Sequence, residues 1–473
     1  MKFLKIAFFT VGTFLAVTVL GLFLGSADMS HYDDLGLLDQ VMDVPSSMNG
    51  YSEVAFTQEE DFELFADGEN GDILKQHVYH ETWDPTFADT AIFDTAMYVD
   101  SAIASTRYSY FKFPTTNGVD ELPNYPHVID LARLMIVKSM HHARNGELTE
   151  AIEQAKYATL LSQKVKTESN HWLISHMIGL TMQYETLVWV NHLSIDYDLS
   201  QDQRRLILSI FDTVPSYHED SFSQIFAGEF VFASNMVDMI QQTPISERWQ
   251  QYWSQEDWWN IELNDDFSLG ERNAQESTLD FMQTLFPKYY LHKNRTLNRI
   301  AKRYSELSSQ ALNYCNSIEL PRADDAEVKW IDLVKPNAKA AQWADDASIF
   351  EQYYTRRCFG HALVDGVKAV AAINSYISDF GELPESLRAL VPEYLSRIPI
   401  DPFTGAELNY SPEKGYVYSV GANFEDNGGS EDSYYIHHCQ QNERCANNPT
   451  FPVHFSLPVG DMYYSEYEGC EDE

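Results

Sequence analysis

Basic residues are scarce in this chain of 473 residues, which has 32 Lys and Arg against 71 Asp and Glu and a formal net charge of −39. A surface of that sign repels phosphate backbones and anionic lipid surfaces, which argues against nucleic-acid binding. The acidity is typical of a well-solvated, soluble surface, and a cation-binding role is the alternative.

Motifs of known catalytic sites are also missing. The sequence contains no H-E-x-x-H, G-x-S-x-G, Walker or G-x-G-x-x-G motif. His77, His80 and Glu81 form a short cluster whose order matches no zinc arrangement, and we expect it to lie on the surface. Acids are too numerous to single out a general acid and base. The sequence therefore identifies no catalytic residue.

Cysteine is rare, with five residues and none before Cys315. The closely spaced Cys439 and Cys445 predict a disulfide in an oxidising compartment. Zinc ligation with His437 and His438 is the alternative, although the chain has no C-x-x-C pair. The odd count leaves at least one thiol free or paired between chains.

One long uncharged run stands at the N-terminus. Ile6 to Leu24 has no charged side chain and would span about 28 Å as a helix, close to the thickness of a bilayer core. Lys2 and Lys5 precede the run, which predicts a cytoplasmic N-terminus. Residues 1–27 are therefore a predicted single-pass anchor in the inner (cytoplasmic) membrane, with the bulk of the chain periplasmic. A cleaved signal ending near Ala27 is the alternative.

The composition changes along the rest of the chain. Residues 28–120 are acidic, aromatic and rich in turn pairs, and we expect an irregular cap or linker with a few short strands or helices. The sequence of residues 121–350 predicts an all-helical domain. The helices are expected at 128–144, from 147 onward, and at 172–193, 201–213, 219–241, 276–309 and 338–380.

The first two helices predict a hairpin. Apolar residues recur every three or four positions over 128–144, Asn145-Gly146 stops that helix, and the next one presents the small residues Ala151, Ala155 and Ala158. Small side chains let antiparallel helices approach closely.

The hairpin resembles a tetratricopeptide unit through Ala143, Gly146, Leu148 and Ala151. The resemblance implies a mainly α fold built as an array of irregular helical hairpins, and an ordinary helical bundle is the alternative.

The most specific motifs follow Gly381. They are Leu383-Pro384 to Leu395, then Asp401-Pro402-Phe403-Thr404-Gly405, then Tyr416 to Gly421, and finally an acidic glycine loop. This series resembles the C-terminal half of the major pseudopilin of type II secretion systems. The resemblance implies a small α+β module over 351–436, a helix plus a small antiparallel sheet, before an acidic Cys-containing tail at 437–473. The whole chain is also similar to bacterial proteins that join a membrane anchor and a helical domain to this ending.

Local chemistry predicts the same hairpin in this module. Asp401-Pro402 begins a turn, Gly405 permits positive φ, and the alternating Tyr416, Tyr418 and Val420 suit a half-buried strand.

In pseudopilins the terminal glycine loop holds calcium. The resemblance therefore implies a calcium site at Asn423, Asp426, Glu431 and Asp432, whose oxygen atoms are ligands that calcium prefers. A merely solvated acidic turn is the alternative.

Two function classes follow from the sequence. The first is a non-enzymatic envelope protein that binds or scaffolds other proteins through its helical domain, with a link to secretion. The second is an exported hydrolase acting on polysaccharide or peptide, whose carboxylates assemble only in the fold. Exposure of Trp249, Trp253, Trp258 and Trp259 in a groove would favour binding, although indoles stacked in a core are the alternative.

Overall fold

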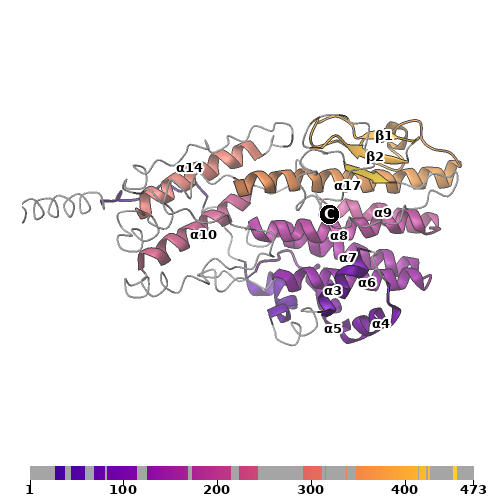
Figure 1. The fold of residues 1–473 in the computed structure, drawn as a ribbon, viewed down its shortest axis with the longest axis horizontal. Helices are drawn as coiled ribbons and strands as arrows, with labels where there is room; N and C mark the ends of the chain where they lie inside the picture. Colours follow the sequence, from indigo (N-terminus) through magenta and orange to yellow (C-terminus); the bar gives the residue numbers. More distant parts are fainter. Residues whose placement is uncertain are drawn as a thin grey trace, which may run out of the picture.

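The structure is mainly α-helical, as the sequence predicts, with a small antiparallel sheet near its C-terminal end (Figure 1). The computed structural model describes residues 27–37, 44–58, 69–79, 83–113, 125–168, 173–214, 223–242, 291–311, 315, 337, 348–413, 415–421, 424, 426 and 451–454.

A bundle of long helices forms the centre. The helices α6 and α7 pack side by side, α8 lies against both, and α17 runs along α8 (Figure 1). The elements are α6 (Tyr125–Arg144), α7 (Leu148–Glu168), α8 (Leu173–Asp196), α9 (Gln201–Ile210), η5 (Phe211–Thr213) and α17 (Ser348–Phe380). The bounds of α6 to α9 lie close to those predicted, and α17 ends at the predicted Phe380; the first ten residues of that predicted helix, 338–347, lie outside the described residues.

The turn between α6 and α7 shows why the hairpin forms. Gly146 has a φ of +80°, its N–H donates to the carbonyl of Ala143 at 3.0 Å, and the N–H of Glu147 donates to the carbonyl of His142 at 2.9 Å. These two bonds close the C-terminus of α6 in a Schellman motif, which needs a left-handed residue at this position. The predicted small-residue face is buried, with Ala151, Ala155 and Ala158 fully covered.

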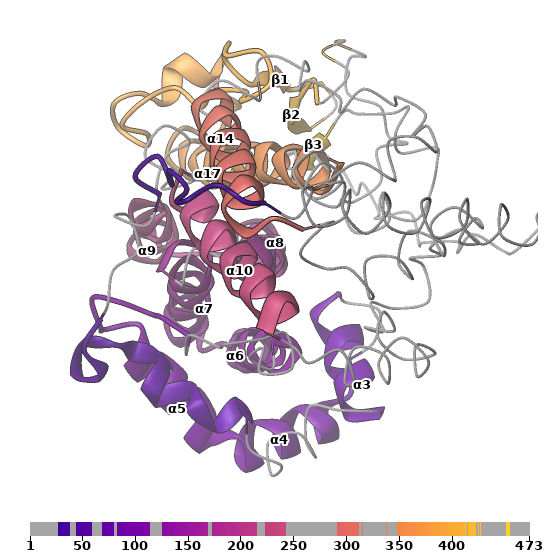
Figure 2. The same cartoon turned by 90° about the vertical axis from the view of Figure 1, so that its left-hand side faces the viewer.

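Three short helices cover one side of the bundle, in the region expected to be mostly irregular. They follow an arc beside α6 (Figure 2) and contribute Ala88, Ala91, Val99 and Ala102 to the core. The three helices are α3 (Glu69–Val78), α4 (Pro85–Asp94) and α5 (Ala96–Ser105), and two 3-10 helices, η2 (Ser46–Met48) and η3 (Gly50–Gln58), precede them. Asp84 caps α4 by accepting from the N–H groups of Thr86 and Phe87. α4 and α5 bury mostly small side chains, so their local apolar pattern is weak.

A second helical pair stands at the other end of the molecule. α10 (Ser223–Gln242) packs against α14 (Lys293–Ala311), and both share a core cluster with the first turns of α17. The side chain of Gln241 donates to the carbonyl of Leu291 at 2.8 Å, so the end of α10 lies beside the start of α14. The two helices are therefore antiparallel.

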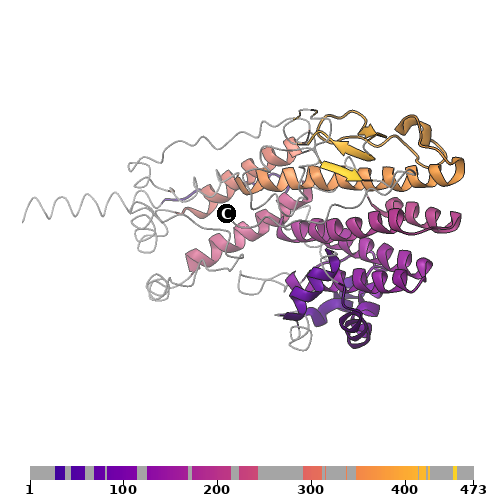
Figure 3. The same ribbon diagram turned by 45° about the vertical axis from the view of Figure 1, so that its right-hand side comes forward.

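The C-terminal elements sit on the face of α17 that points away from α8 (Figures 1 and 3). They are η8 (Leu387–Leu390), β1 (Asn409–Ser411), β2 (Tyr416–Ser419) and β3 (Phe451–His454), in the antiparallel order β1-β2-β3. Tyr410 pairs with Val417, which pairs with Val453, and this confirms the expected hairpin. Leu390 and Val417 belong to the same core cluster as α6, α7 and α8, so the sheet shares its core with the bundle.

Candidate functional site

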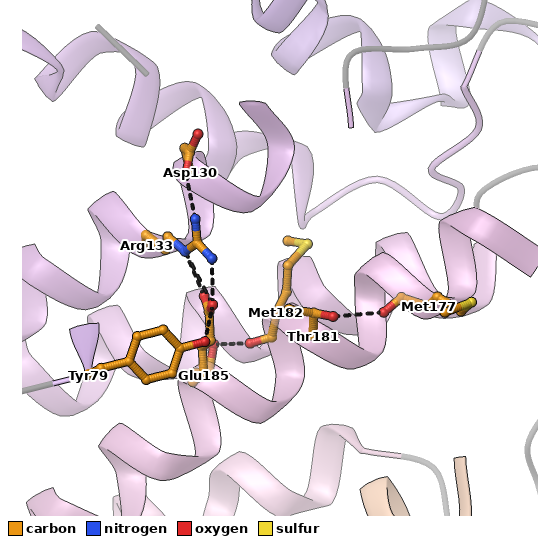
Figure 4. Close-up of polar contacts among 8 residues, drawn as sticks. Tyr79, Asp130, Arg133, Met177, Thr181, Met182 and Glu185 are labelled. Atoms are coloured by element: carbon orange, nitrogen blue, oxygen red, sulfur yellow. Dashed lines mark hydrogen bonds and ion pairs between the residues drawn. The ribbon is translucent and has the colours of Figure 1, made fainter. Parts of the chain in front are cut away.

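A buried ionic cluster links charged side chains of α6 and α8 (Figure 4). Arg133 on α6 donates through Nη1 to Asp130 at 2.9 Å, one turn earlier on the same helix. Its Nη2 donates to Oε1 of Glu185 on α8 at 2.7 Å, and its Nε donates to Oε2 of the same carboxylate at 3.0 Å. The hydroxyl of Tyr79, just after α3, donates to Glu185 at 2.8 Å. The cluster thus joins α3, α6 and α8.

Burial sets the electrostatics of these groups. The side chain of Glu185 is fully buried, and that of Asp130 is 9% exposed. Burial raises the pKa of Asp130 to about 6, against the opposing effect of the Arg133 charge. Burial alone would lower the pKa of Arg133, but the carboxylates of Glu185 and Asp130 outweigh it and raise that pKa. Burial next to the Glu185 carboxylate also raises the pKa of Tyr79.

The geometry fits helix positioning better than catalysis or anion binding. The three nitrogen atoms of Arg133 that act as donors are directed at Asp130 and Glu185. Bidentate pairing of this kind fixes orientation, and breaking a buried pair leaves an uncompensated charge. The cluster therefore holds the N-terminal layer on the bundle.

A second carboxylate, which is half-buried, joins α10 to the start of α8. Glu229 on α10 accepts from the N–H of Leu173, the first residue of α8, at 2.7 Å. Burial raises the pKa of Glu229 to about 7, although the bond from Leu173 opposes the shift. A carboxylate at this position satisfies one of the unpaired N–H groups of the first turn of α8.

The Asp-Pro motif of the C-terminal module is a structural turn. Asp401 is 1% exposed and accepts from the Ser419 hydroxyl and from the N–H groups of Phe403 and Val420, each at 2.9 Å. Gly405, with a φ of +68°, closes the turn by donating to the carbonyl of Asp401 at 2.8 Å. One buried carboxylate thus fastens this turn to the end of β2.

The predicted calcium ligands are mostly outside the described residues. Asn423, Glu431 and Asp432 lie there, and only Asp426 is described, where it accepts from the Tyr418 hydroxyl at 2.9 Å. The described part of the chain holds no group of three or more His, Cys, Asp or Glu side chains suited to a metal ion. The calcium site stays a prediction.

The structure pairs two cysteines that the spacing did not suggest. Cys315 and Cys358 form a disulfide between residues 43 apart in sequence, and both are buried. The predicted pair Cys439 and Cys445 lies outside the described residues, as does Cys470.

The expected surface position of His77 is wrong. It is 1% exposed, packs against Trp83 and Phe87, and accepts from the N–H of Asp84 at 3.0 Å. His80 and Glu81, like the four tryptophans at 249, 253, 258 and 259, lie outside the described residues. His77 therefore helps to position the start of α4.

Among the described helices, none is both long enough and apolar enough to cross a membrane. The predicted anchor, Ile6 to Leu24, falls outside the described residues.

Comparison of the chain with models of protein families, with curated proteins and with solved structures gave no match.

Proposed function

We propose that this chain is a membrane-anchored envelope protein that binds or scaffolds other proteins on the outer side of the cytoplasmic membrane, without being an enzyme. The observation that supports this location is the buried disulfide bond between Cys315 and Cys358. Structural disulfides persist in oxidising compartments and are rare in the cytosol. The bond therefore supports export, the same direction that Lys2, Lys5 and the apolar run Ile6 to Leu24 favour.

The helical architecture and the chemistry of its buried acids support binding rather than catalysis. The carboxylates of Asp130 and Glu185 are engaged by Arg133, Glu229 binds the start of α8, and Asp401 binds its own turn. Each of these acids has a structural partner, so none is offered to a substrate. Within the described part of the chain, the geometry gives no specific support to a hydrolase.

Two finer proposals concern the fold. The α6–α7 hairpin, with its Schellman turn at Gly146 and its buried Ala151, supports a tetratricopeptide-like unit. The order of α17, η8, the Asp401 turn and the β1–β2 hairpin supports a pseudopilin-like module. In this proposal the module serves as a contact surface for secretion-related partners.

A topology experiment tests the location. A reporter active only outside the cytoplasm, fused after Glu473, should be active, and the protein should stay with membranes after an alkaline wash. An inactive reporter would refute the exported topology. Recovery in the soluble fraction, with a new N-terminus near Asp28, would show a cleaved signal in place of an anchor.

Crosslinking in intact envelopes tests the binding role. Full-length protein crosslinked in place and purified should carry a reproducible set of envelope proteins that mass spectrometry identifies. Substitution of exposed residues should reduce the yield of those partners while the circular dichroism spectrum stays unchanged. Recovery of the same proteins with an unrelated anchored control would contradict the proposal.

A further inference from the structure

The helices α4 and α5 behave as one bent helix with two unlike sides. The N–H of Thr95 donates to the carbonyl of Ala91, and the N–H of Val99 donates to the carbonyl of Thr95, each at 3.0 Å, so helical hydrogen bonds continue across the junction. The buried positions recur every three or four residues, which places them on one side of this bent helix, against α6. They are Ala88, Ala91, Thr95, Val99 and Ala102.

Two large apolar side chains stand on the opposite, outward side. Phe93 is 83% exposed and Met97 is 67% exposed, the highest values for large apolar side chains among the described residues. They are four residues apart, so they are neighbours on the helix surface, and they are called the apolar pair below. Figure 2 shows α4 and α5 along the outer edge of the molecule, beyond α6. Because solvent reaches most of both side chains in the folded chain, the apolar pair is open to a partner.

The segment around the apolar pair is acidic. Residues 84–106 include no Lys or Arg, and their acids are Asp84, Asp89, Asp94 and Asp100. Asp89 precedes the pair by four residues and Asp100 follows it by three, so these two carboxylates flank the pair on the same side. They lie 3.4 and 3.9 Å from His141 and Lys138 on α6, yet both side chains remain largely exposed. Their charge is therefore available to a partner that covers the apolar pair.

The charge pattern selects the kind of partner. A second copy of the chain has the same net charge of −39 and the same acids on this side, so face-to-face pairing would bring like charges together. An anionic lipid surface is repelled for the same reason. A helix with an apolar stripe between Lys or Arg side chains complements both the apolar pair and the acids that flank it.

We infer that the outward side of α4 and α5 binds a basic amphipathic helix of a partner protein. Phe93 and Met97 pack into the apolar stripe of that helix, and Asp89 and Asp100 lie beside its Lys or Arg side chains. This inference rests on the protein-binding part of the proposed function and adds the place and the chemistry of the contact.

A designed peptide tests this surface in the full-length protein. The probe is a fluorescent helix of leucine and lysine whose leucines recur every three or four positions, and its binding to protein in neutral detergent is followed by anisotropy, with detergent alone as background. Phe93→Gln with Met97→Gln should weaken binding at least about tenfold, the scale of losing a well-packed anchor. The matched control, Phe380→Gln with Met29→Gln, removes an exposed Phe and an exposed Met elsewhere and should leave the affinity unchanged.

A second peptide separates the surface from general charge. It has the same composition, but its leucines are spread around the helix, so the net charge of the protein attracts both peptides equally. We expect it to bind at least about tenfold more weakly than the first. Equal affinity of the two peptides would overturn the inference, and so would undiminished binding by the Phe93→Gln, Met97→Gln variant.

Crosslinking in intact envelopes distinguishes failure of this inference from failure of the proposed function. The Phe93→Gln, Met97→Gln variant should lose a partner that the control variant keeps. Retention of every partner by both variants would refute this surface alone. Absence of any reproducible partner from the unmodified protein would refute the binding role itself.

Discussion

Removal of the disulfide between Cys315 and Cys358 should cost a large part of the folding free energy. The bond closes a loop of 43 residues in the unfolded chain. In the chain-entropy model a loop of that length raises the free energy of unfolding by about 4 kcal/mol at 25 °C. Domains are usually stable by about 5–15 kcal/mol, so the loss is large enough to measure directly.

The two sulfur atoms lie in a core cluster, which decides the choice of variant. Cys315 and Cys358 are 1% and 0% exposed. Serine would add the cost of burying hydroxyl groups without partners, so the double variant Cys315→Ala, Cys358→Ala is preferred. Reduction of the unmodified protein gives an independent measurement without any substitution.

Urea unfolding followed by far-ultraviolet circular dichroism is the assay. The urea concentration at the midpoint of unfolding should fall in the variant and in the reduced protein. The dependence of the unfolding free energy on urea concentration should become steeper, because an uncrosslinked chain exposes more surface when it unfolds. The predicted pair Cys439 and Cys445 provides the comparison. It encloses a short segment, so its removal should cost only about 2 kcal/mol.

Peptide mapping without reduction identifies the bonds before any unfolding is measured. The peptides carrying Cys315 and Cys358 should be joined, and so should those carrying Cys439 and Cys445. An unchanged midpoint in the Cys315→Ala, Cys358→Ala variant, or free alkylation of both thiols in the native protein, would refute the reasoning.

Three further predictions follow from buried groups. Glu185→Gln should lower the free energy of unfolding by about 3–5 kcal/mol, measured in urea, because it leaves Arg133 buried with one carboxylate. Arg388→Gln, which removes an exposed ion pair, should leave the urea midpoint unchanged, and equal effects of the two substitutions would contradict a structural role for the cluster. The folded-state pKa of Asp130 is raised from 3.8 to about 6, so the unmodified protein should lose stability as pH rises through that window. Asp130→Asn lacks this titration, so its stability relative to that of the unmodified protein should rise by up to about 3 kcal/mol as pH rises from 3.8 to about 6; parallel pH profiles of the two proteins would rule this out. Gly179→Ala would place a Cβ 2.5 Å from the Lys166 backbone and should lower the free energy of unfolding by about 1–3 kcal/mol or more. Gly360→Ala would meet one flexible atom of Leu180 at 3.0 Å and should be tolerated. Thermal melting of both variants tests this, and an undiminished melting temperature of Gly179→Ala would disprove the close approach of α7 and α8.

The sequence predicts those parts of the fold that depend on local signals. The hairpin of α6 and α7 follows from its apolar period and from Gly146, whose positive φ ends the first helix. The β1–β2 hairpin follows from the alternation of Tyr416 and Tyr418. In both cases the deciding interactions lie within a few residues of one another.

Contacts between distant segments are the part that the sequence does not predict. Helices α4 and α5 bury small residues such as Ala91 and Ala102, and only the surface of α6 makes that burial favourable. Arg133 and Glu185 are 52 residues apart, and no spacing rule links them. A signal for this pair was present, since Glu185 is the only charged residue of α8 before its last position. An isolated acid in an apolar helix requires a partner.

The length of α17 links the folding of the two ends of the protein. Its 33 residues make a rod of about 50 Å, with Tyr353 and Tyr354 in one core cluster and Val367 and Val370 in the other. Neither cluster can lose its packing without removing support from the same helix. We therefore expect amide protons along α17 to exchange in one cooperative step, at the free energy of global unfolding, because partial opening of either end would leave half of the helix without its packing partners.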